Sequence, residues 1–289
     1  MDDHRFVFVC GLQRSGTTML YRLLGEHPEV SPLSGTARPG NEGQHNQTVY
    51  PSDPYHSKAG RFAFRPEARL TEKSPLVNDG NRRLLFEEWS RFWDTSAPYL
   101  LEKSPPNLIR TRFLQAMFPD SYFITILRHP IPNVLATQKW DPGTRPHALL
   151  EHWLRAHELF AADVSHVRRL HVLRYEDLVT DPDGELGRVF AFLDLDDPNR
   201  GREPAEGVNL DNFAADQTLR SNVNDKYFEE WRARRRSLTG RLYYEALERR
   251  YERRVRAFGY SLRDPESVEA PTLPLPGLAG SVRHPAPTA

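Results

Sequence analysis

The first thirty residues combine a short apolar run, a turn that contains glycine, and an amphipathic helix. The run Phe6–Cys10 is rich in aromatic and β-branched residues, which favours a buried strand. Gly11 and Gly16 bound the turn, and the segment from Thr17 to about Gly25 carries apolar side chains at helical spacing. A strand, a glycine-containing turn and a helix in this order direct backbone N–H groups toward an anion. The sequence therefore predicts a loop that binds a phosphate-like group.

The rest of the chain alternates short apolar strands with longer helices. Further strands are predicted at Tyr99–Leu101, Tyr122–Leu127 and Leu170–Leu173. The predicted helices span residues 82–93, 105–117, 129–140, 146–169, 181–195, 225–237 and 241–258. Strands that alternate with helices are typical of a parallel sheet with helices packed on its faces. We therefore expect an α/β fold with three layers.

Two segments lack this alternation. Residues 31–75 are rich in Gly, Pro, Asn, Gln and His, and a loop region of that length is usually a lid or a binding surface. Residues 261–289 are rich in Pro, Ala and Gly, which is typical of a disordered tail. We therefore expect a single domain over residues 1–260, with a substrate-facing loop region at about 31–75, followed by a disordered tail.

The composition limits the kinds of partner. The chain has 39 Lys and Arg residues against 39 Asp and Glu residues, whereas non-specific binding to nucleic acid needs a strong positive field. No apolar run reaches the roughly 18 residues of a membrane-spanning helix. The N-terminus leads directly into a strand without a signal peptide, so we expect a cytoplasmic protein. Cys10 is the only cysteine, which excludes an internal disulfide.

The predicted loop differs from a nucleoside triphosphate loop at one position. Such a loop reads GxxxxGK[ST], and the two glycines have this spacing, but Thr17 stands where the lysine would be. Arg14 places a positive charge inside the turn instead. Two later strands end in Arg128 and Tyr175, which supply no carboxylate for Mg²⁺. These features favour an anion that is bound without a metal ion.

Five segments resemble, in the same order, motifs of sulfotransferases that use 3′-phosphoadenosine 5′-phosphosulfate (PAPS). The first, GLQRSGTTML, is similar to the 5′-phosphosulfate loop of the branch with Arg in the loop, which includes tyrosylprotein sulfotransferases and many bacterial members. The others are LEKSPPN, YFITILRHPIPNVLAT, LRYEDL and LRSNVNDKYFEEW. The matches extend from about residue 6 to residue 235. The resemblance implies a P-loop-like sulfotransferase fold, a PAPS donor and no metal ion.

The resemblance also implies which residues contact the donor. Arg128 would bind the 3′-phosphate, and Tyr175 would approach the adenine. The late segment would return to the donor through Arg220 and Ser221. The 5′-phosphosulfate would be held by five loop residues: Arg14, Ser15, Gly16, Thr17 and Thr18.

Two cations are expected to act on the transferred group. Sulfuryl transfer resembles phosphoryl transfer, an in-line displacement in which positioning and electrostatics supply the catalysis. By resemblance, Arg14 lies beside the sulfo group, and Lys103 stabilises charge on the leaving phosphate oxygen. Lys73 lies in a similar word, TEKSP, but precedes no matching helix, strand and arginine, so Lys103 is the preferred candidate.

One position departs from the family pattern. The family usually carries a Ser eight positions after the signature arginine, and here that position is Ala136. Thr137 follows it directly. Either Thr137 supplies the hydroxyl group after a small shift, or Arg128 acts with other partners.

A hydroxyl acceptor needs a general base within hydrogen-bond reach. Members of the family use Glu or His, and the polar loop contains GNEGQHNQ, with Glu42 and His45. In the tyrosylprotein branch a Glu follows the HP that ends the first helix, and Glu42 is the next acidic residue here after Glu29. We therefore predict Glu42 as the base, with His45 beside it as an acceptor ligand or alternative base.

The acceptor and some alternatives stay open at the level of sequence. The polar loop suits a polyhydroxylated small molecule such as a sugar, a nucleoside, a glycolipid or another natural product. A P-loop kinase or NTPase would require ATP and Mg²⁺, which the missing loop lysine argues against. A non-catalytic nucleotide-binding protein is the other alternative, and a homodimer is left open.

Overall fold

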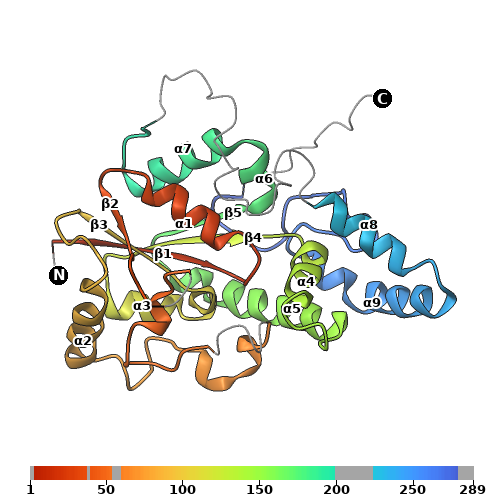
Figure 1. Cartoon of the computed structure of the whole chain (residues 1–289), viewed down its shortest axis with the longest axis horizontal. Coiled ribbons are helices and arrows are strands. Elements are labelled where there is room, and N and C mark those ends of the chain that lie inside the picture. Colours follow the sequence, from red (N-terminus) through yellow and green to blue (C-terminus); the bar gives the residue numbers. More distant parts are fainter. Residues whose placement is uncertain (1–2, 38–39, 54–59, 199–223, 279–289) are drawn as a thin grey trace.

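The computed structural model describes residues 3–37, 40–53, 60–198 and 224–278. Its centre is a parallel sheet of five strands in the order β2-β3-β1-β4-β5 (Figure 1). The strands are β1 (Arg5–Gly11), β2 (Val30–Pro32), β3 (Tyr99–Lys103), β4 (Tyr122–Leu127) and β5 (Leu170–Arg174). The predicted α/β fold with a parallel sheet is confirmed.

Helices cover both faces of the sheet, which gives the three layers expected (Figure 1). One face carries α1 (Thr17–Gly25), α6 (Tyr175–Thr180) and α7 (Pro182–Leu193). The other face carries α2 (Asp79–Ser90), α3 (Thr111–Met117), α4 (Pro130–Gln138) and α5 (Pro146–Asp163). Two further helices, α8 (Asp225–Arg234) and α9 (Leu238–Arg256), contact α4 and α5.

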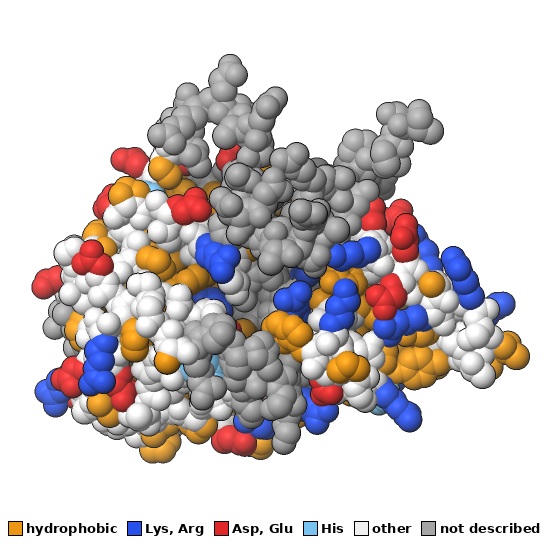
Figure 2. Space-filling model, in the orientation of Figure 1, with side chains coloured by type: hydrophobic (Ala, Val, Ile, Leu, Met, Phe, Trp, Pro, Cys, Tyr) orange, Lys and Arg blue, Asp and Glu red, His pale blue; other side chains and the backbone are white. Residues whose placement is uncertain are grey.

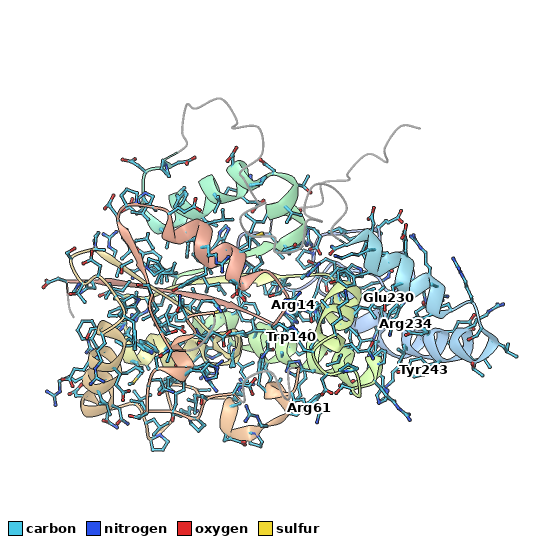
Figure 3. All side chains as sticks on the ribbon, viewed as in Figure 1. Arg14, Arg61, Trp140, Glu230, Arg234 and Tyr243 are labelled. Atoms are coloured by element: carbon cyan, nitrogen blue, oxygen red, sulfur yellow. The ribbon has the colours of Figure 1, made fainter. Side chains whose placement is uncertain are left out.

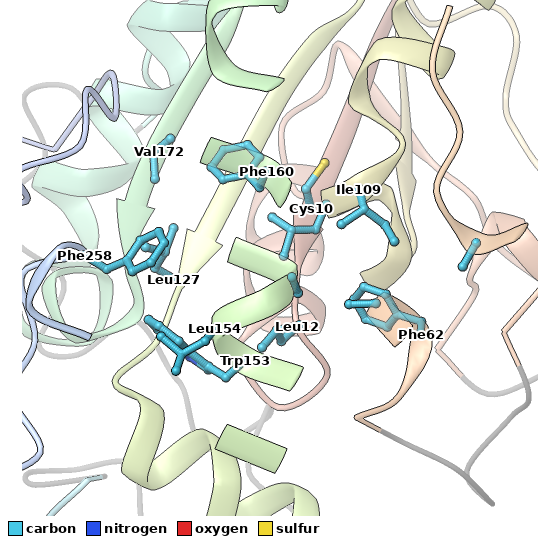
Figure 4. Close-up of a cluster of buried hydrophobic side chains, with 14 of the residues drawn as sticks. Cys10, Leu12, Phe62, Ile109, Leu127, Trp153, Leu154, Phe160, Val172 and Phe258 are labelled. Atoms are coloured by element: carbon cyan, nitrogen blue, oxygen red, sulfur yellow. The ribbon is translucent and has the colours of Figure 1, made fainter. Parts of the chain in front are cut away.

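The alternation of β1 divides the core in two. Side chains of a strand point alternately to opposite faces of its sheet. Phe6, Phe8 and Cys10 belong to the cluster beneath α2, α3 and α5, part of which is shown in Figure 4. Val7 and Val9 belong to the cluster beneath α1 and α7. Because both faces of β1 are buried, the strand reads as the continuous apolar run seen in the sequence.

Two elements were not predicted. β2 has three residues and pairs with β3 from Val30 onward, which is too short to produce a visible period. α6 starts at Tyr175 directly after β5, so no loop residues separate the strand from the helix and mark where the helix begins. The predicted helix 105–117 is divided, because Arg110 leaves the helical conformation between the 3₁₀ turn Pro105–Ile109 and α3.

The long polar segment is anchored to the fold at several points. Among the described residues it contains 3₁₀ turns at Gly43–His45, Phe62–Phe64 and Pro66–Ala68. The buried guanidinium of Arg110 donates hydrogen bonds to two backbone carbonyls of this segment, at 2.9 and 3.0 Å. The side chain of Trp89 donates another, at 3.0 Å. Buried side chains of Arg110 and Trp89 therefore hold the described parts of this segment in place.

The expectation of disorder from residue 261 does not hold for residues 261–278. Leu262 and Leu275 are buried in the core, and Val172 N on the edge strand β5 donates a hydrogen bond to Pro276 O at 2.7 Å. Isolated apolar side chains in a proline-rich segment are thus enough to dock it. Residues 279–289 lie outside the described part of the chain, and the single-domain assignment of 1–260 stays a prediction.

On the molecular face shown in Figure 2, much of the Lys and Arg lies on the side of the last two helices, which are rich in arginine. Several of these arginines pair with a glutamate one turn away on the same helix, as in Arg234–Glu230 and Arg256–Glu252.

In the described ranges no helix is both long and apolar enough to cross a bilayer.

Candidate active site

Four predicted site elements meet at one edge of the sheet. The strands are parallel, so their carboxyl ends share an edge, and open α/β sheets bind ligands there. Lys103 ends β3, residues 12–16 follow β1, Arg128 follows β4, and Tyr175 follows β5. Since these strands are neighbours in the order β3-β1-β4-β5, the fold brings together residues that lie far apart in the sequence.

The loop has the backbone of an anion-binding turn. Arg14 and Gly16 adopt positive φ values of 66° and 99°. A Cβ atom on Gly16 would lie 2.5 Å from the ring of Tyr175, so only glycine fits between this ring and the start of α1. The first turn of α1 has no acidic residue, and its N-cap residue, Gly16, has no side chain that could cap it. The N–H groups of that turn are therefore suited to bind an anion.

The hydroxyl side chains of the loop differ in burial and in hydrogen bonding. Ser15 is buried, and both its N–H and its hydroxyl donate hydrogen bonds to Leu12 O, at 3.1 and 2.7 Å. These bonds close the turn in this state. Thr17 is also buried, whereas Thr18 is half-buried. The predicted contacts of these residues with a donor stay predictions.

Arg128 lies in direct contact with the loop and with Tyr175. Its Nη1 donates a hydrogen bond to Arg14 O at 2.9 Å, and its Cζ lies 4.3 Å from the centre of the Tyr175 ring. Asn224 Oδ1 accepts from Arg128 Nη2 at 2.9 Å. Burial raises the pKa of Tyr175, so this ring stays neutral beside the guanidinium. The structure thus unites the predicted 3′-phosphate and adenine residues.

Glu176 connects several segments around Arg128, a role that no sequence motif predicts. Its Oε1 accepts hydrogen bonds from His129 N at 3.0 Å and from Asn224 Nδ2 at 2.7 Å, and its Oε2 accepts one from Tyr260 OH at 2.9 Å. The carboxylate therefore ties the end of β4 to the start of α8 and to the C-terminal segment. Glu176 lies inside the quoted LRYEDL segment, but these partners are 47 or more positions away, so only the fold reveals the contacts.

The predicted base meets the predicted lysine. Lys103 Nζ donates a hydrogen bond to Glu42 Oε1 at 3.1 Å, and the lysine is almost fully buried. Glu42 Oε2 accepts from Gln44 Nε2 at 2.7 Å and lies 3.7 Å from His45 Nε2. Glu42, His45 and Lys103 are therefore neighbours at the carboxyl end of β3.

A hydrogen-bond chain links the turn of Glu42 to the phosphate loop. Gln44 Oε1 accepts from Asp53 N at 2.9 Å, and Gln13 Nε2 donates to Asp53 Oδ2 at 3.2 Å. Arg65 pairs with the other oxygen of the same carboxylate. Burial raises the pKa of Asp53 to about 6, although Arg65 opposes this shift. The chain fixes the distance between the turn and residue 13 of the loop.

The side chain of Arg14 points toward an exposed aromatic residue. Its Cζ lies 4.9 Å from the centre of the Trp140 ring, and the two residues are adjacent in Figure 3. Trp140 is 40% exposed. A cation over an aromatic ring is attracted by its electron-rich face. The contact orients the one loop side chain that the sequence analysis expected to act on the transferred group.

Other predicted residues are not united with the site by a described contact. Thr137 is buried, with its methyl group 3.4 Å from the position that a Cβ on Gly60 would take, and no described contact joins it to Arg128. Lys73 is exposed on the surface, unlike Lys103. Arg220 and Ser221 lie outside the described residues. The roles of Thr137, Arg220 and Ser221 stay predictions.

Comparison with curated proteins finds relatives of known activity. The chain is 28% identical over 199 residues to protein-tyrosine sulfotransferase 2 of Gallus gallus, a match that covers 65% of this chain and 51% of the relative. It is 25% identical over 201 residues to protein-tyrosine sulfotransferase 1 of Danio rerio, covering 67% and 54%. The chain thus spans about half the length of the curated relatives it matches.

The chain also aligns with a solved structure and matches a family model. The sulfotransferase domain of the Synechococcus PCC 7002 olefin synthase aligns with a TM-score of 0.48 at 21% identity, covering 78% of this chain and 87% of that one. A sequence model described as the sulfotransferase family matches residues 7–199. This match covers more than half of the chain and includes the loop, Glu42, Lys103, Arg128 and Tyr175. The chain therefore belongs to the sulfotransferase family.

Proposed function

We propose that the protein transfers a sulfuryl group from PAPS to a hydroxyl group of a small molecule. The observation that carries the proposal is the contact of Glu42 with Lys103 at the sheet edge where the anion loop also lies. A carboxylate that accepts a proton and an ammonium group that stabilises a leaving oxygen are the two functions this reaction needs. Both groups come from separate segments that the fold joins.

The donor would lie along the carboxyl edge of the sheet. Its 5′-phosphosulfate would meet the N–H groups at the start of α1 and the guanidinium of Arg14. Its 3′-phosphate would meet Arg128, displacing Asn224 from part of that guanidinium, and its adenine would lie near Tyr175. Charge-assisted hydrogen bonds to guanidinium groups are strong and directional, so two separated arginines favour a donor with two separated anionic groups.

The reaction would proceed in a single displacement. Glu42 takes the proton of the acceptor hydroxyl while the hydroxyl oxygen attacks sulfur. The bond between sulfur and the bridging phosphate oxygen breaks, and 3′-phosphoadenosine 5′-phosphate (PAP) leaves with the bonding electrons. Lys103, which pairs with Glu42 in the described state, stabilises the charge that grows on the leaving oxygen. Arg14 stabilises the equatorial oxygens of the sulfo group.

The substitution E42Q tests the base. It keeps the shape of the side chain but removes its ability to take a proton, so kcat for labelled-sulfate transfer should fall by about 10²- to 10⁴-fold. The rise in melting temperature caused by PAP should stay as in the unmodified protein. The exposed Glu29 gives a matched control, and E29Q should transfer sulfate at the normal rate.

The outcome separates the two candidate bases. A normal rate for E42Q would exclude Glu42 as the base. Loss of transfer in H45N together with a normal rate for E42Q would assign the role to His45. The acceptor itself is found by a labelled-sulfate screen over hydroxylated small molecules and tyrosine-containing peptides. Peptides are included because the curated relatives are named as protein-tyrosine sulfotransferases. Transfer to peptides alone would contradict the small-molecule part of the proposal.

A further inference from the structure

The turn that carries Glu42 is anchored by side chains from the end of β3. Gly43 N donates a hydrogen bond to Glu102 Oε1 at 2.8 Å, and Gln44 N donates one to Ser104 Oγ at 3.0 Å. These two N–H groups directly follow Glu42 in the chain. Their positions therefore fix the point from which the carboxylate of Glu42 extends.

Glu102 is a fully buried carboxyl group that the proposed reaction does not use. Besides Gly43 N, it accepts hydrogen bonds from Ser104 Oγ at 2.6 Å and from Asn107 Nδ2. Burial raises its pKa to about 7, against the effect of these donors. A buried carboxyl group is costly unless its oxygens are satisfied, so a site that gives it three donors points to a specific role.

The fit between the turn and Glu102 is close. A Cβ atom on Gly43 would lie 2.6 Å from side-chain atoms of Glu102, so only glycine allows this approach. The carbonyl of Gly43 accepts a further hydrogen bond from Trp89 Nε1 at 3.0 Å. Both polar groups of the residue after Glu42 are thus held by buried side chains, and the turn has little freedom to shift along the strand end.

The same strand end also supplies the lysine that contacts the base. Glu102 and Lys103 are consecutive in β3, so one rigid element sets the place of the turn and of the ammonium group. We propose that Glu102 is a positioning residue for the catalytic base, which it serves by fixing Gly43 and thereby holding Glu42 against Lys103. This inference rests on the proposed function, because it takes Glu42 as the base.

The first test compares two substitutions at the same position. E102A removes the acceptor of Gly43 N but leaves that of Gln44 N, and misplacement of a catalytic group by about 1 Å can cost roughly 10²-fold in rate. We expect kcat to fall by about that factor, while the KM for PAPS and the PAP-induced rise in melting temperature change less than about twofold. E102Q should recover most of kcat, because its amide oxygen still accepts from Gly43 N and Ser104 Oγ. Asn107, whose Oδ1 has no partner within the described residues, can turn to accept from the new N–H group.

Two further variants keep the test sharp if E102A fails to fold. S104A removes the acceptor of Gln44 N and one of the three donors to Glu102, and kcat should fall roughly tenfold with an unchanged KM for PAPS. Glu88 provides the matched control, since its carboxylate also accepts a backbone N–H of this polar segment, from Thr48 at 2.8 Å, rather than one that directly follows Glu42 in the chain. E88A should therefore transfer sulfate at a normal rate.

A double-mutant cycle isolates the link to Glu42. If Glu102 acts through the base, E102A should cost almost nothing further in an E42Q background, whereas independent effects would multiply. Normal kcat in both E102A and S104A, or full additivity with E42Q, would overturn this inference while E42Q still lacks activity. Absence of transfer by the unmodified protein would overturn the proposed function itself, and with it the role of Glu102.

Discussion

The word Glu-Lys-Ser-Pro occurs twice in the chain, and the two copies have opposite fates. The first copy, residues 72–75, lies in the polar segment, and its Glu72 and Lys73 are exposed. The second copy, residues 102–105, ends β3 and is almost fully buried. The same four residues are thus surface polar groups in one place and a candidate catalytic element in the other, because only the second begins within the last residues of a central strand.

The electrostatic surroundings of the two glutamates differ in the same way. Arg112 holds the pKa of Glu72 down at about 2 through a surface hydrogen bond. Burial raises the pKa of Glu102 to about 7. The same local sequence therefore gives two different electrostatic environments. The environment depends on whether the residue lies at the end of a strand in the central sheet.

The largest expected difference between the copies is in the two lysines. K103A removes a cation from the developing charge on the leaving oxygen, and the loss of one such stabilising group typically costs about 10²- to 10³-fold in kcat. K73A removes a solvated charge and should leave kcat within about twofold. Initial rates of labelled-sulfate transfer at saturating PAPS measure both. Equal effects of the two substitutions would remove the distinction on which the site assignment is based.

The pH dependence of stability should also differ, and in opposite directions. Both carboxyl groups titrate near pH 4.5 when unfolded. Because the pKa of Glu102 is raised, the folded protein binds more protons than the unfolded protein between pH 4.5 and 7. The contribution of Glu102 to stability is therefore present below pH 4.5 and lost as the pH rises through 7. The lowered pKa of Glu72 makes its contribution present above pH 4.5 and lost as the pH falls toward 2.

Melting temperatures of E102Q and E72Q against the unmodified protein measure these contributions. The melting temperature of E102Q should rise relative to that of the unmodified protein between pH 4.5 and 7. That of E72Q should fall relative to it between pH 2 and 4.5, by a smaller amount, because surface ion pairs contribute little. If the difference in melting temperature between E102Q and the unmodified protein does not change with pH, the carboxyl group of Glu102 has the same pKa in the folded and the unfolded protein.

The smallest effect is expected from substitution of the serine in the first copy, Ser74, in contrast to Ser104 in the second copy. Ser104 is fully buried and accepts the hydrogen bond of Gln44 N, whereas Ser74 Oγ accepts one from the next-but-one residue, Leu76 N, at 3.3 Å. S74A should leave both kcat and melting temperature almost unchanged, since surface substitutions outside special features are usually neutral. A loss of activity in S74A comparable to that of S104A would contradict the account.

Much of the fold could be predicted because its signals are local. The glycines at 11 and 16 and the apolar runs of β1, β4 and β5 are readable from short windows of sequence. β2 was missed because three residues show no period. The composition of residues 261–278 predicts disorder, but Leu262 and Leu275 reach the core from separated positions in this segment.

The candidate site could be predicted only where a motif marked it. Lys103 and Arg128 were found through the words around them, and Glu42 through its place after the first helix. The contact between Glu42 and Lys103 spans 61 positions, and that of Arg128 with Asn224 spans 96, so no spacing rule could show them. The sequence does not show the role of Glu176, whose partners are distant in the chain, or the contact of Glu102 with Gly43 N, which spans 59 positions.

The most direct test of the central claim is a thermal shift with two nucleotides. A donor site with separated cations at Arg14 and Arg128 should bind PAP without a metal ion. At a concentration of about 100 times Kd, binding contributes about 2.7 kcal/mol, which corresponds to a rise in melting temperature of several degrees. We predict this rise with PAP, its reduction in R128A, and no rise with ATP and Mg²⁺. A rise with ATP and Mg²⁺ but none with PAP would contradict the account.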